Sequence, residues 1–290
     1  MSARGAGQAS GEDDLIARYF KPLATDPGAF GLVDDAAILT GAPGDIVVTT
    51  DAIVEGVHFL PGDPPDTIAR KALRVNLSDL AAKGAEPAGF VLTLGLREAS
   101  DAWLAPFARA LGEDAKAFNC PLLGGDTVST PGPLTISVTA FGRVPSRAMV
   151  RRSTARAGDV VVVSGTIGDA TLGLAVLQQR VLADEASVQD ALVARYREPQ
   201  PRVALALAVR THASASMDVS DGLAGDLAKL CKASGVSADV RLADIPLSAA
   251  AKSVLAAKAS TIEALIAGGD DYEILCTAAE DRLASFRQAA

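Results

Sequence analysis

The sequence KALRVNLSDLAAKGA, at residues 71–85, decides how the first half of this chain folds. One stripe at helical spacing runs through it and the turn before it: Ile68, Ala72, Val75, Asp79 and Ala82. The apolar members predict a helix that packs on a sheet. Asp79 lies on the same stripe, and an unpaired carboxylate there would be costly to desolvate. We therefore expect Asp79 to have a partner, either a basic side chain or a metal ion.

Three β-like stretches surround this helix, at residues 45–51, 89–96 and 134–144. A second helix is predicted between the last two by a second stripe: Leu104, Phe107, Leu111, Ala115 and Phe118. The order is therefore β-α-β-α-β, and both helices should lie on one sheet. An amphipathic helix is predicted at residues 12–23, after a small, polar N-terminus at 1–11 that we expect to be disordered.

The texture of the sequence changes at residues 151–159, a short, basic, glycine-containing link. We place a domain boundary there, between an N-terminal domain at 12–150 and a C-terminal domain at 151–290. The second domain alternates expected helices and strands, which predicts an α/β fold. Its expected helices are 169–182, 202–212, 223–233 and 261–267, and its expected strands are 160–164, 216–219, 238–242 and 272–277.

Composition narrows the class of protein. The chain has 290 residues, of which 49% are hydrophobic, and its 27 Lys and Arg against 35 Asp and Glu give a formal charge of −8. This balance disfavours nucleic acid or an anionic membrane as a partner. The three cysteines form no CxxC pair, and we find neither an export signal nor a membrane-spanning run. The expected location is the cytoplasm.

Aspartates recur beside glycines or at strand ends in six short segments: 33–37, 49–51, 76–79, 124–127, 218–222 and 268–273. Any one of them alone is more often a turn or a helix cap. Magnesium prefers hard oxygen ligands and is usually shared between a few carboxylates and phosphate oxygens. The set together therefore favours a magnesium site that handles phosphate groups.

Several residues remain open between a structural and a functional reading. Asp51 closes a β-branched run and could be a solvated strand end; His58 is one of two histidines and would by itself be a packing residue. Arg151 and Arg152 could be a solvated pair or a phosphate clamp. Neither GxxxxGK[ST] nor GxGxxG occurs, which disfavours a P-loop kinase and a Rossmann dehydrogenase.

With these segments in this order, the sequence resembles the thiamine-monophosphate kinase family, which shares a superfamily with aminoimidazole ribonucleotide synthetase. The similarity runs from about residue 12 to residue 277. Its most specific stretches are residues 49–51, 55–59, 71–85, 124–127, 218–223 and 269–273.

The resemblance implies ATP-dependent phosphorylation of thiamine monophosphate by direct in-line transfer through several Mg²⁺ ions, without a catalytic side chain or a phospho-enzyme. The implied magnesium positions are Asp35, Thr49, Thr50, Asp51, Asp79, Asp126, Asp218 and Asp221. The implied ATP contacts are Phe118, Gly125, Asp126, Arg152 and Ser220. The implied contacts with thiamine monophosphate are His58 and Asp270.

The resemblance also implies a two-domain α/β (α+β) fold of the aminoimidazole ribonucleotide synthetase type. In it the N-terminal sheet pairs across a homodimer and the C-terminal domain covers the cleft. Three departures are visible: Val33 replaces a usual glycine, Asp270 a commoner glutamate, and the chain stops before strands and a helix that relatives carry, so we expect a shortened C-terminal domain. The alternatives are another ATP-dependent member of the superfamily and a non-catalytic nucleotide-binding scaffold.

Overall fold

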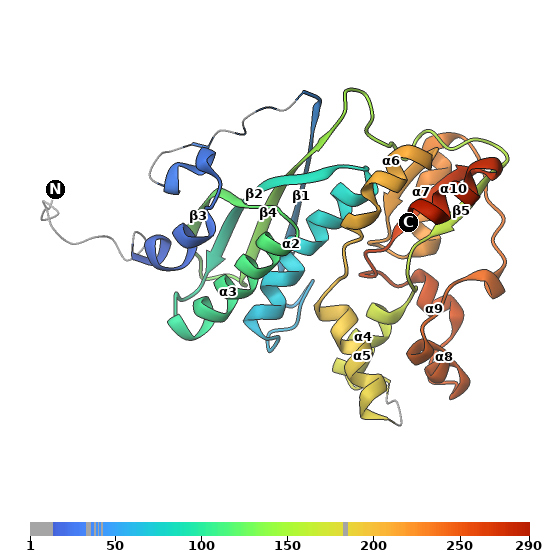
Figure 1. The fold of residues 1–290 in the computed structure, drawn as a ribbon. Helices are drawn as coiled ribbons and strands as arrows, with labels where there is room; N and C mark the ends of the chain where they lie inside the picture. Colours follow the sequence, from blue (N-terminus) through green and yellow to red (C-terminus); the bar gives the residue numbers. More distant parts are fainter. Residues whose placement is uncertain (1–13, 33–35, 38, 40, 42, 182–184) are drawn as a thin grey trace, which may run out of the picture.

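The computed structural model describes residues 14–32, 36–37, 39, 41, 43–181 and 185–290 (Figure 1). Its first half contains a four-stranded sheet with the order β1-β4-β2-β3. The middle strand β4 is antiparallel to both of its neighbours, whereas β3 is parallel to β2. The strands are β1 (Asp45–Val54), β2 (Glu86–Leu96), β3 (Leu122–Ser129) and β4 (Thr135–Val144).

Two helices, α2 (Pro65–Ala82) and α3 (Asp101–Ala117), pack beside this sheet, with α2 toward the C-terminal half of the molecule (Figure 1). Ile68, Ala72 and Val75 of the predicted stripe lie in the core of the N-terminal sheet, and the helix is buried far beyond that stripe. Leu73, Leu77 and Leu80 are all 0% exposed. They lie in the N-terminal core, whereas Ala81 and Ala82 lie in a second apolar cluster, because α2 also contacts β6, β7 and α6 of the second half. Helix α2 therefore packs against both halves of the molecule.

The second half contains an antiparallel sheet with the order β5-β7-β6. Its strands are β5 (Asp159–Val163), β6 (Ala215–Asp218) and β7 (Ile274–Ala279). Its helices are α4 (Asp169–Leu177), α5 (Ala186–Arg197), α6 (Ala206–His212), α7 (Leu223–Ser234), α8 (Ala249–Ala256), α9 (Ile262–Ala267) and α10 (Leu283–Ala289). No helix in the described part of the chain is long and apolar enough to cross a membrane.

Short helical turns complete the fold. A π-helical turn at Ile16–Phe20 falls within the helix expected at 12–23, and the chain continues into 3₁₀ turns. Tyr19 and Phe20 are buried in the N-terminal core. The 3₁₀ turns are Lys21–Leu23, Pro27–Leu32, Val203–Leu205, Leu242–Asp244 and Glu280–Arg282.

One expected strand is absent from the described structure, and one strand was not predicted. The stretch 238–242 is not a strand: Val240 is 43% exposed and Leu242 48% exposed, so the alternating pattern there has no apolar face to bury. The glycine-rich stretch around Gly125 lies in strand β3, which was not predicted. A Cβ atom at Gly125 would lie 2.0 Å from the carbonyl oxygen of Leu92 on β2, so the glycine permits the close approach of two strands. Helices α5, α8 and α10 were also not predicted.

The predicted domain boundary at 150/151 lies in the connection between β4 and β5, and it stays a prediction. In Figure 1 the two sheets lie on opposite sides of α2. Of the segments that carry aspartates, 49–51 contacts α2 from the N-terminal sheet, and 218–222 contacts it from the C-terminal domain.

Candidate active site

Helix α2 brings the side chain of Asp79 against the inner face of β1. The hydroxyl of Thr49 donates a hydrogen bond to the Asp79 carboxylate. Thr49 and Asp51 share this face because residues two apart on a strand point the same way. The backbone N–H of Asp51 donates to the side-chain oxygen of Asn76, also on α2, over 3.0 Å. Asp51 and Asp79 are thus held beside each other, and Asp51 lies inside β1 rather than at the strand end that was expected.

A third acid joins them from the C-terminal domain. Asp218 ends β6, is 7% exposed, and accepts a hydrogen bond of 2.9 Å from the Ser78 hydroxyl. Burial, followed by the charge of Asp79, raises the pKa of Asp218 to about 8. Burial and Asp79 also raise the pKa of Asp51. Asp51, Asp79 and Asp218 therefore form one cluster, called the acidic cluster below, in which the charge of Asp79 opposes ionisation of the other two.

The cations near the acidic cluster are few. Lys83 follows α2 and donates a 2.8 Å hydrogen bond to the carbonyl of Ser216. Burial lowers the pKa of Lys83, Asp79 and Asp218 oppose that shift, and Arg152 adds to it, so Lys83 and Arg152 both lie near these acids. Among the described residues, no basic side chain forms an ion pair with Asp79. The partner expected for Asp79 is thus a hydroxyl group, and the cluster still favours a cation.

Other predicted metal positions lie apart from the acidic cluster. The Thr50 hydroxyl points to the opposite face of β1, where it donates to the carbonyl of Val138 over 3.1 Å. Asp221 is exposed and forms an ion pair with Lys229. Asp126 is on β3, separated from β1 by β4 and β2. Asp35 lies outside the described residues.

Gly125 and Asp126 line a pocket of about 390 Å³ on the β3 side of the sheet. Its other walls come from the N-terminal segment, β2 and β3: Ile16, Phe20, Leu32, Ala36, Ala37, Val91, Leu92, Leu122, Leu123, Gly124 and Thr127. Phe118, predicted as an ATP contact, is not part of this wall. Its ring lies 5.8 Å from the guanidinium carbon of Arg74.

The two predicted substrate contacts meet at a residue that the sequence did not single out. The ammonium group of Lys71 on α2 donates to the carbonyl oxygen of His58 over 2.8 Å and to the Asp270 carboxylate over 2.9 Å. The His58 ring nitrogen Nδ1 accepts a hydrogen bond from the backbone N–H of Val54 over 3.1 Å. Ser220 lies beside Asp270, because its carbonyl oxygen accepts a hydrogen bond of 2.9 Å from the backbone N–H of Asp270.

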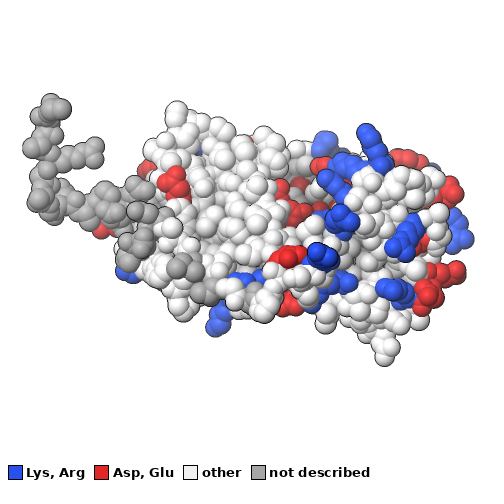
Figure 2. Space-filling view, turned by 90° about the horizontal axis from the view of Figure 1, so that it is seen from above, with Lys and Arg blue, Asp and Glu red and all other residues white. Residues whose placement is uncertain are grey.

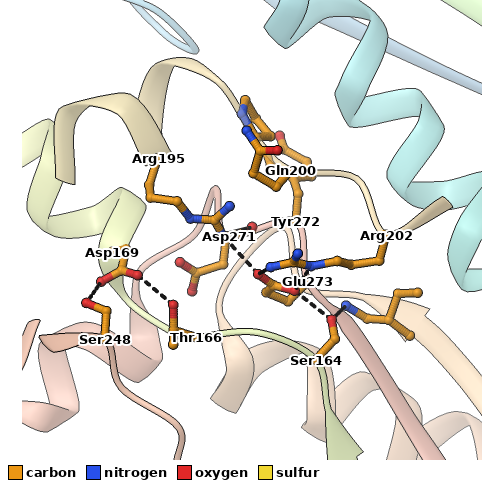
Figure 3. Close-up of polar contacts among 12 residues, drawn as sticks. Ser164, Thr166, Asp169, Arg195, Gln200, Arg202, Ser248, Asp271, Tyr272 and Glu273 are labelled. Atoms are coloured by element: carbon orange, nitrogen blue, oxygen red, sulfur yellow. Dashed lines mark hydrogen bonds and ion pairs between the residues drawn. The ribbon is translucent and has the colours of Figure 1, made fainter. Parts of the chain in front are cut away.

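The rest of the 268–273 segment anchors the C-terminal domain (Figure 3). Buried Glu273 is 0% exposed and accepts hydrogen bonds from Arg195, Arg202 and Ser164. Asp271 accepts from the backbone N–H of Gly168 at the start of α4, and burial raises its pKa to about 7. The motif at 268–273 singled out Asp271 and Glu273 in the sequence. No pattern in α5 indicated that Arg195 would be a partner of Glu273.

Comparisons with known proteins agree with this arrangement. A model described as the AIR synthase related protein N-terminal domain matches residues 33–144, and the C-terminal domain of the same description matches residues 156–290. A thiamine-monophosphate kinase from Caulobacter vibrioides is 48% identical over 288 residues, which cover 96% of this chain and 80% of that relative. The chain belongs to the thiamine-monophosphate kinase family.

Solved structures of this family have the same fold. A crystal structure of thiamine-monophosphate kinase from Stenotrophomonas maltophilia K279a has a TM-score of 0.84 and 39% identity, and it covers 95% of this chain and 87% of that chain. A structure of AaThiL complexed with AMPPCP and TMP has a TM-score of 0.79 and 32% identity, and it covers 89% of this chain and 87% of that chain. The predicted two-domain α/β fold is thereby confirmed.

Proposed function

We propose that this chain is a thiamine-monophosphate kinase, which transfers the γ-phosphoryl group of ATP to thiamine monophosphate. The observation that carries the proposal is the acidic cluster, in which Asp51 and Asp79 of the N-terminal domain meet Asp218 of the C-terminal domain beside α2. Membership of the thiamine-monophosphate kinase family supports the choice of substrates. The relatives bearing that name extend beyond this chain, which spans 80% of the Caulobacter vibrioides protein.

The proposed reaction is a direct, in-line displacement. A terminal phosphate oxygen of thiamine monophosphate forms a bond to the γ-phosphorus of ATP, the bond from that phosphorus to the β–γ bridging oxygen breaks, and ADP leaves with the electron pair. The attacking oxygen is already anionic at neutral pH, so no strong general base is needed. The protein's main contribution is to orient two polyanions and to reduce their repulsion.

The acidic cluster fits Mg²⁺ as the cation that this task requires. Within the described residues no three His, Cys, Asp or Glu side chains are placed to hold a metal on their own. Magnesium usually binds through one or two carboxylates and completes its shell with water and phosphate oxygens, so acid pairs such as Asp51 with Asp79 suit it. When bound, Mg²⁺ would neutralise charge on the transferring group. Burial, followed by the charge of Asp79, raises the pKa values of Asp51 and Asp218, and a bound cation would oppose both effects, which supports the proposal.

The remaining predicted contacts divide between the two substrates. We propose that Gly125, Asp126 and Arg152 contribute to ATP binding, with Ser220, while His58 and Asp270 contact thiamine monophosphate. The pocket beside β3 supports the first assignment because Gly125 and Asp126 both line it. The shared bond to Lys71 supports the second, because it places His58 and Asp270 at one location.

We further propose that the N-terminal sheet forms a homodimer, as the resemblance implies. Ile46 is 51% exposed and Val48 56% exposed on the face of β1 that turns away from α2. Seen from above, the N-terminal half carries few charged side chains, whereas charges of both signs gather over the C-terminal domain (Figure 2). An uncharged, partly apolar face is suited to a partner surface. The cytoplasmic location stays a prediction.

The experiment that tests the function compares acceptors. The purified chain is incubated with ATP, Mg²⁺ and either thiamine monophosphate, thiamine or a purine-pathway ribonucleotide amide, and the phosphorylated products are separated. Thiamine diphosphate formed from thiamine monophosphate alone supports the proposal. Turnover of the ribonucleotide alone would assign the chain to another reaction of the superfamily. ATP binding without turnover of any acceptor would favour a scaffold.

A further inference from the structure

Lys71 is the most deeply buried basic residue at the predicted substrate contacts. The residue is 1% exposed, and its ammonium group lies 3.9 Å from the centre of the Tyr196 ring. The ammonium group also donates hydrogen bonds to the His58 carbonyl and to the Asp270 carboxylate. Burial lowers the pKa of Lys71 and the nearby Asp270 opposes that shift. A buried charge of this kind is retained only where several groups compensate for its desolvation.

The groups around Lys71 come from distant parts of the chain. Lys71 belongs to α2, His58 to the turn after β1, Tyr196 to α5 and Asp270 to the segment before β7. Tyr196 closes the arrangement, because its hydroxyl also donates to the His58 carbonyl over 3.3 Å. The ammonium group is therefore the point at which both domains and both predicted substrate contacts are joined.

Asp270 in particular depends on this cation. It has a backbone φ of +69°, which an L-residue rarely adopts, so its position must be imposed by its surroundings. One carboxylate oxygen accepts from Lys71, and the other accepts from the Tyr272 hydroxyl over 3.3 Å. Among the described residues, Lys71 is the one basic side chain in an ion pair with Asp270. The Asp270 side chain is still 26% exposed, whereas that of Lys71 is 2% exposed.

We propose that Lys71 is a positioning residue for the acceptor subsite. It does not touch the substrate; it holds the His58 turn and the Asp270 carboxylate in the single arrangement that presents both to thiamine monophosphate. This inference rests on the proposed function for the identity of the ligand. A carboxylate accepts hydrogen bonds and donates none, so the group that Asp270 meets on the ligand is a donor or a cation.

The test begins with Lys71→Met, which keeps an unbranched side chain and removes the charge. The KM for thiamine monophosphate should rise about tenfold, while the KM for ATP should stay within about twofold. Arg70→Met is the matched control, since Arg70 is the next residue on α2 but pairs with Glu113 and Asp114. It should change neither KM by more than about twofold. An equal rise of both KM values in Lys71→Met, or no rise, would overturn the positioning role.

A double-mutant cycle with Asp270→Asn gives a readout that a general packing role would not produce. If Lys71 acts by holding Asp270, Lys71→Met should raise the KM for thiamine monophosphate by less than about threefold in the Asp270→Asn background. Independent, multiplicative effects would contradict the inference. Lys71→Gln, which keeps a hydrogen-bond donor, serves the same cycle if Lys71→Met does not fold.

Hydrogen exchange separates this inference from the proposed function. Lys71→Met should speed amide exchange in residues 54–60 and 268–273, and Arg70→Met should not. If the wild type is inactive on thiamine monophosphate but Lys71→Met still exchanges faster in both segments, the proposed function is overturned and the positioning of the two segments is supported. Active wild-type protein with unchanged exchange and unchanged KM values in Lys71→Met would overturn the inference alone.

Discussion

The hydroxyl of Ser78 donates a hydrogen bond of 2.9 Å to the carboxylate of Asp218 and so links α2 to β6. The next residue of the helix, Asp79, is bonded to Thr49 of β1. Two consecutive residues of α2 therefore tie the acids of the two domains together. The distance between the domains at the acidic cluster is set by one helix, and changes at this position should affect chemistry more than folding.

Asp79→Asn should reduce kcat at least about 100-fold, because it removes charge that a phosphate-bound cation requires. The amide oxygen can still accept from Thr49, so the melting temperature should change little. ADP release under saturating ATP and Mg²⁺ measures the first effect and thermal unfolding the second. Asp66→Asn, in the first turn of the same helix, is the control. Undiminished magnesium-dependent turnover in Asp79→Asn would exclude Asp79 as a metal ligand.

Ser78→Ala should move the acidic limb of the pH–rate profile to higher pH. The Ser78 hydrogen bond lowers the pKa of Asp218, so its loss raises that pKa above about 8 and leaves less carboxylate at neutral pH. At limiting Mg²⁺, turnover at pH 7 should fall and recover toward pH 9. Ser253→Ala, on the exposed side of α8, provides a matched substitution. A profile that coincides with the wild type would show that this bond does not tune the site.

His58→Ala should raise the KM for thiamine monophosphate about tenfold and the KM for ATP by less than about twofold, because His58 lies beside Asp270 rather than beside β3. The other histidine offers the control. His212 stacks on Phe286 at 6.1 Å, away from the acidic cluster, so His212→Ala should leave both KM values unchanged. Equal effects of His58→Ala on both substrates would point to a packing role.

Asp271→Asn should flatten the pH dependence of stability. The pKa of Asp271 is raised by burial to about 7, so between its unfolded value and 7 the native state binds more protons than the unfolded state. Stability from this group is therefore greatest at low pH and falls as pH rises toward 7 and above. Between pH 5.5 and 8 the wild type should lose about 1–2 kcal/mol more unfolding free energy than Asp271→Asn. Urea titrations at both pH values measure this; parallel losses would contradict the assignment.

The sequence predicted much of the N-terminal domain because its signals are local. The stripe of α2 and the strands around it follow from periodicity, and Asp79 drew attention because a carboxylate interrupts an apolar stripe. The packing of Ala81 and Ala82 against the C-terminal domain did not follow, because their partners Ala208, Val209 and Ile274 lie far away in sequence. Long-range packing of this kind leaves no periodic signal of its own.

The residues of the candidate site differ in the same way: some roles follow from local sequence signals, and others depend on long-range contacts. Asp51, Asp79 and Asp218 were predicted, and the structure places them together. Lys71 was part of a quoted motif but gave no sign of its role, because its ion-pair partner Asp270 lies far away in sequence and on the other domain. The strand expected at 238–242 was wrong for the converse reason: its apolar residues alternate clearly, but none of the described strands pairs with it.

The most direct measurement is product formation by the purified 290-residue chain with ATP and thiamine monophosphate, with and without Mg²⁺. We expect equal amounts of ADP and thiamine diphosphate when Mg²⁺ is present, and neither product when a chelator removes it. Thiamine diphosphate formed at the same rate without any divalent cation would contradict the central claim that the acidic cluster acts through metal ions. ADP formed without thiamine diphosphate would contradict the claim that thiamine monophosphate is the acceptor.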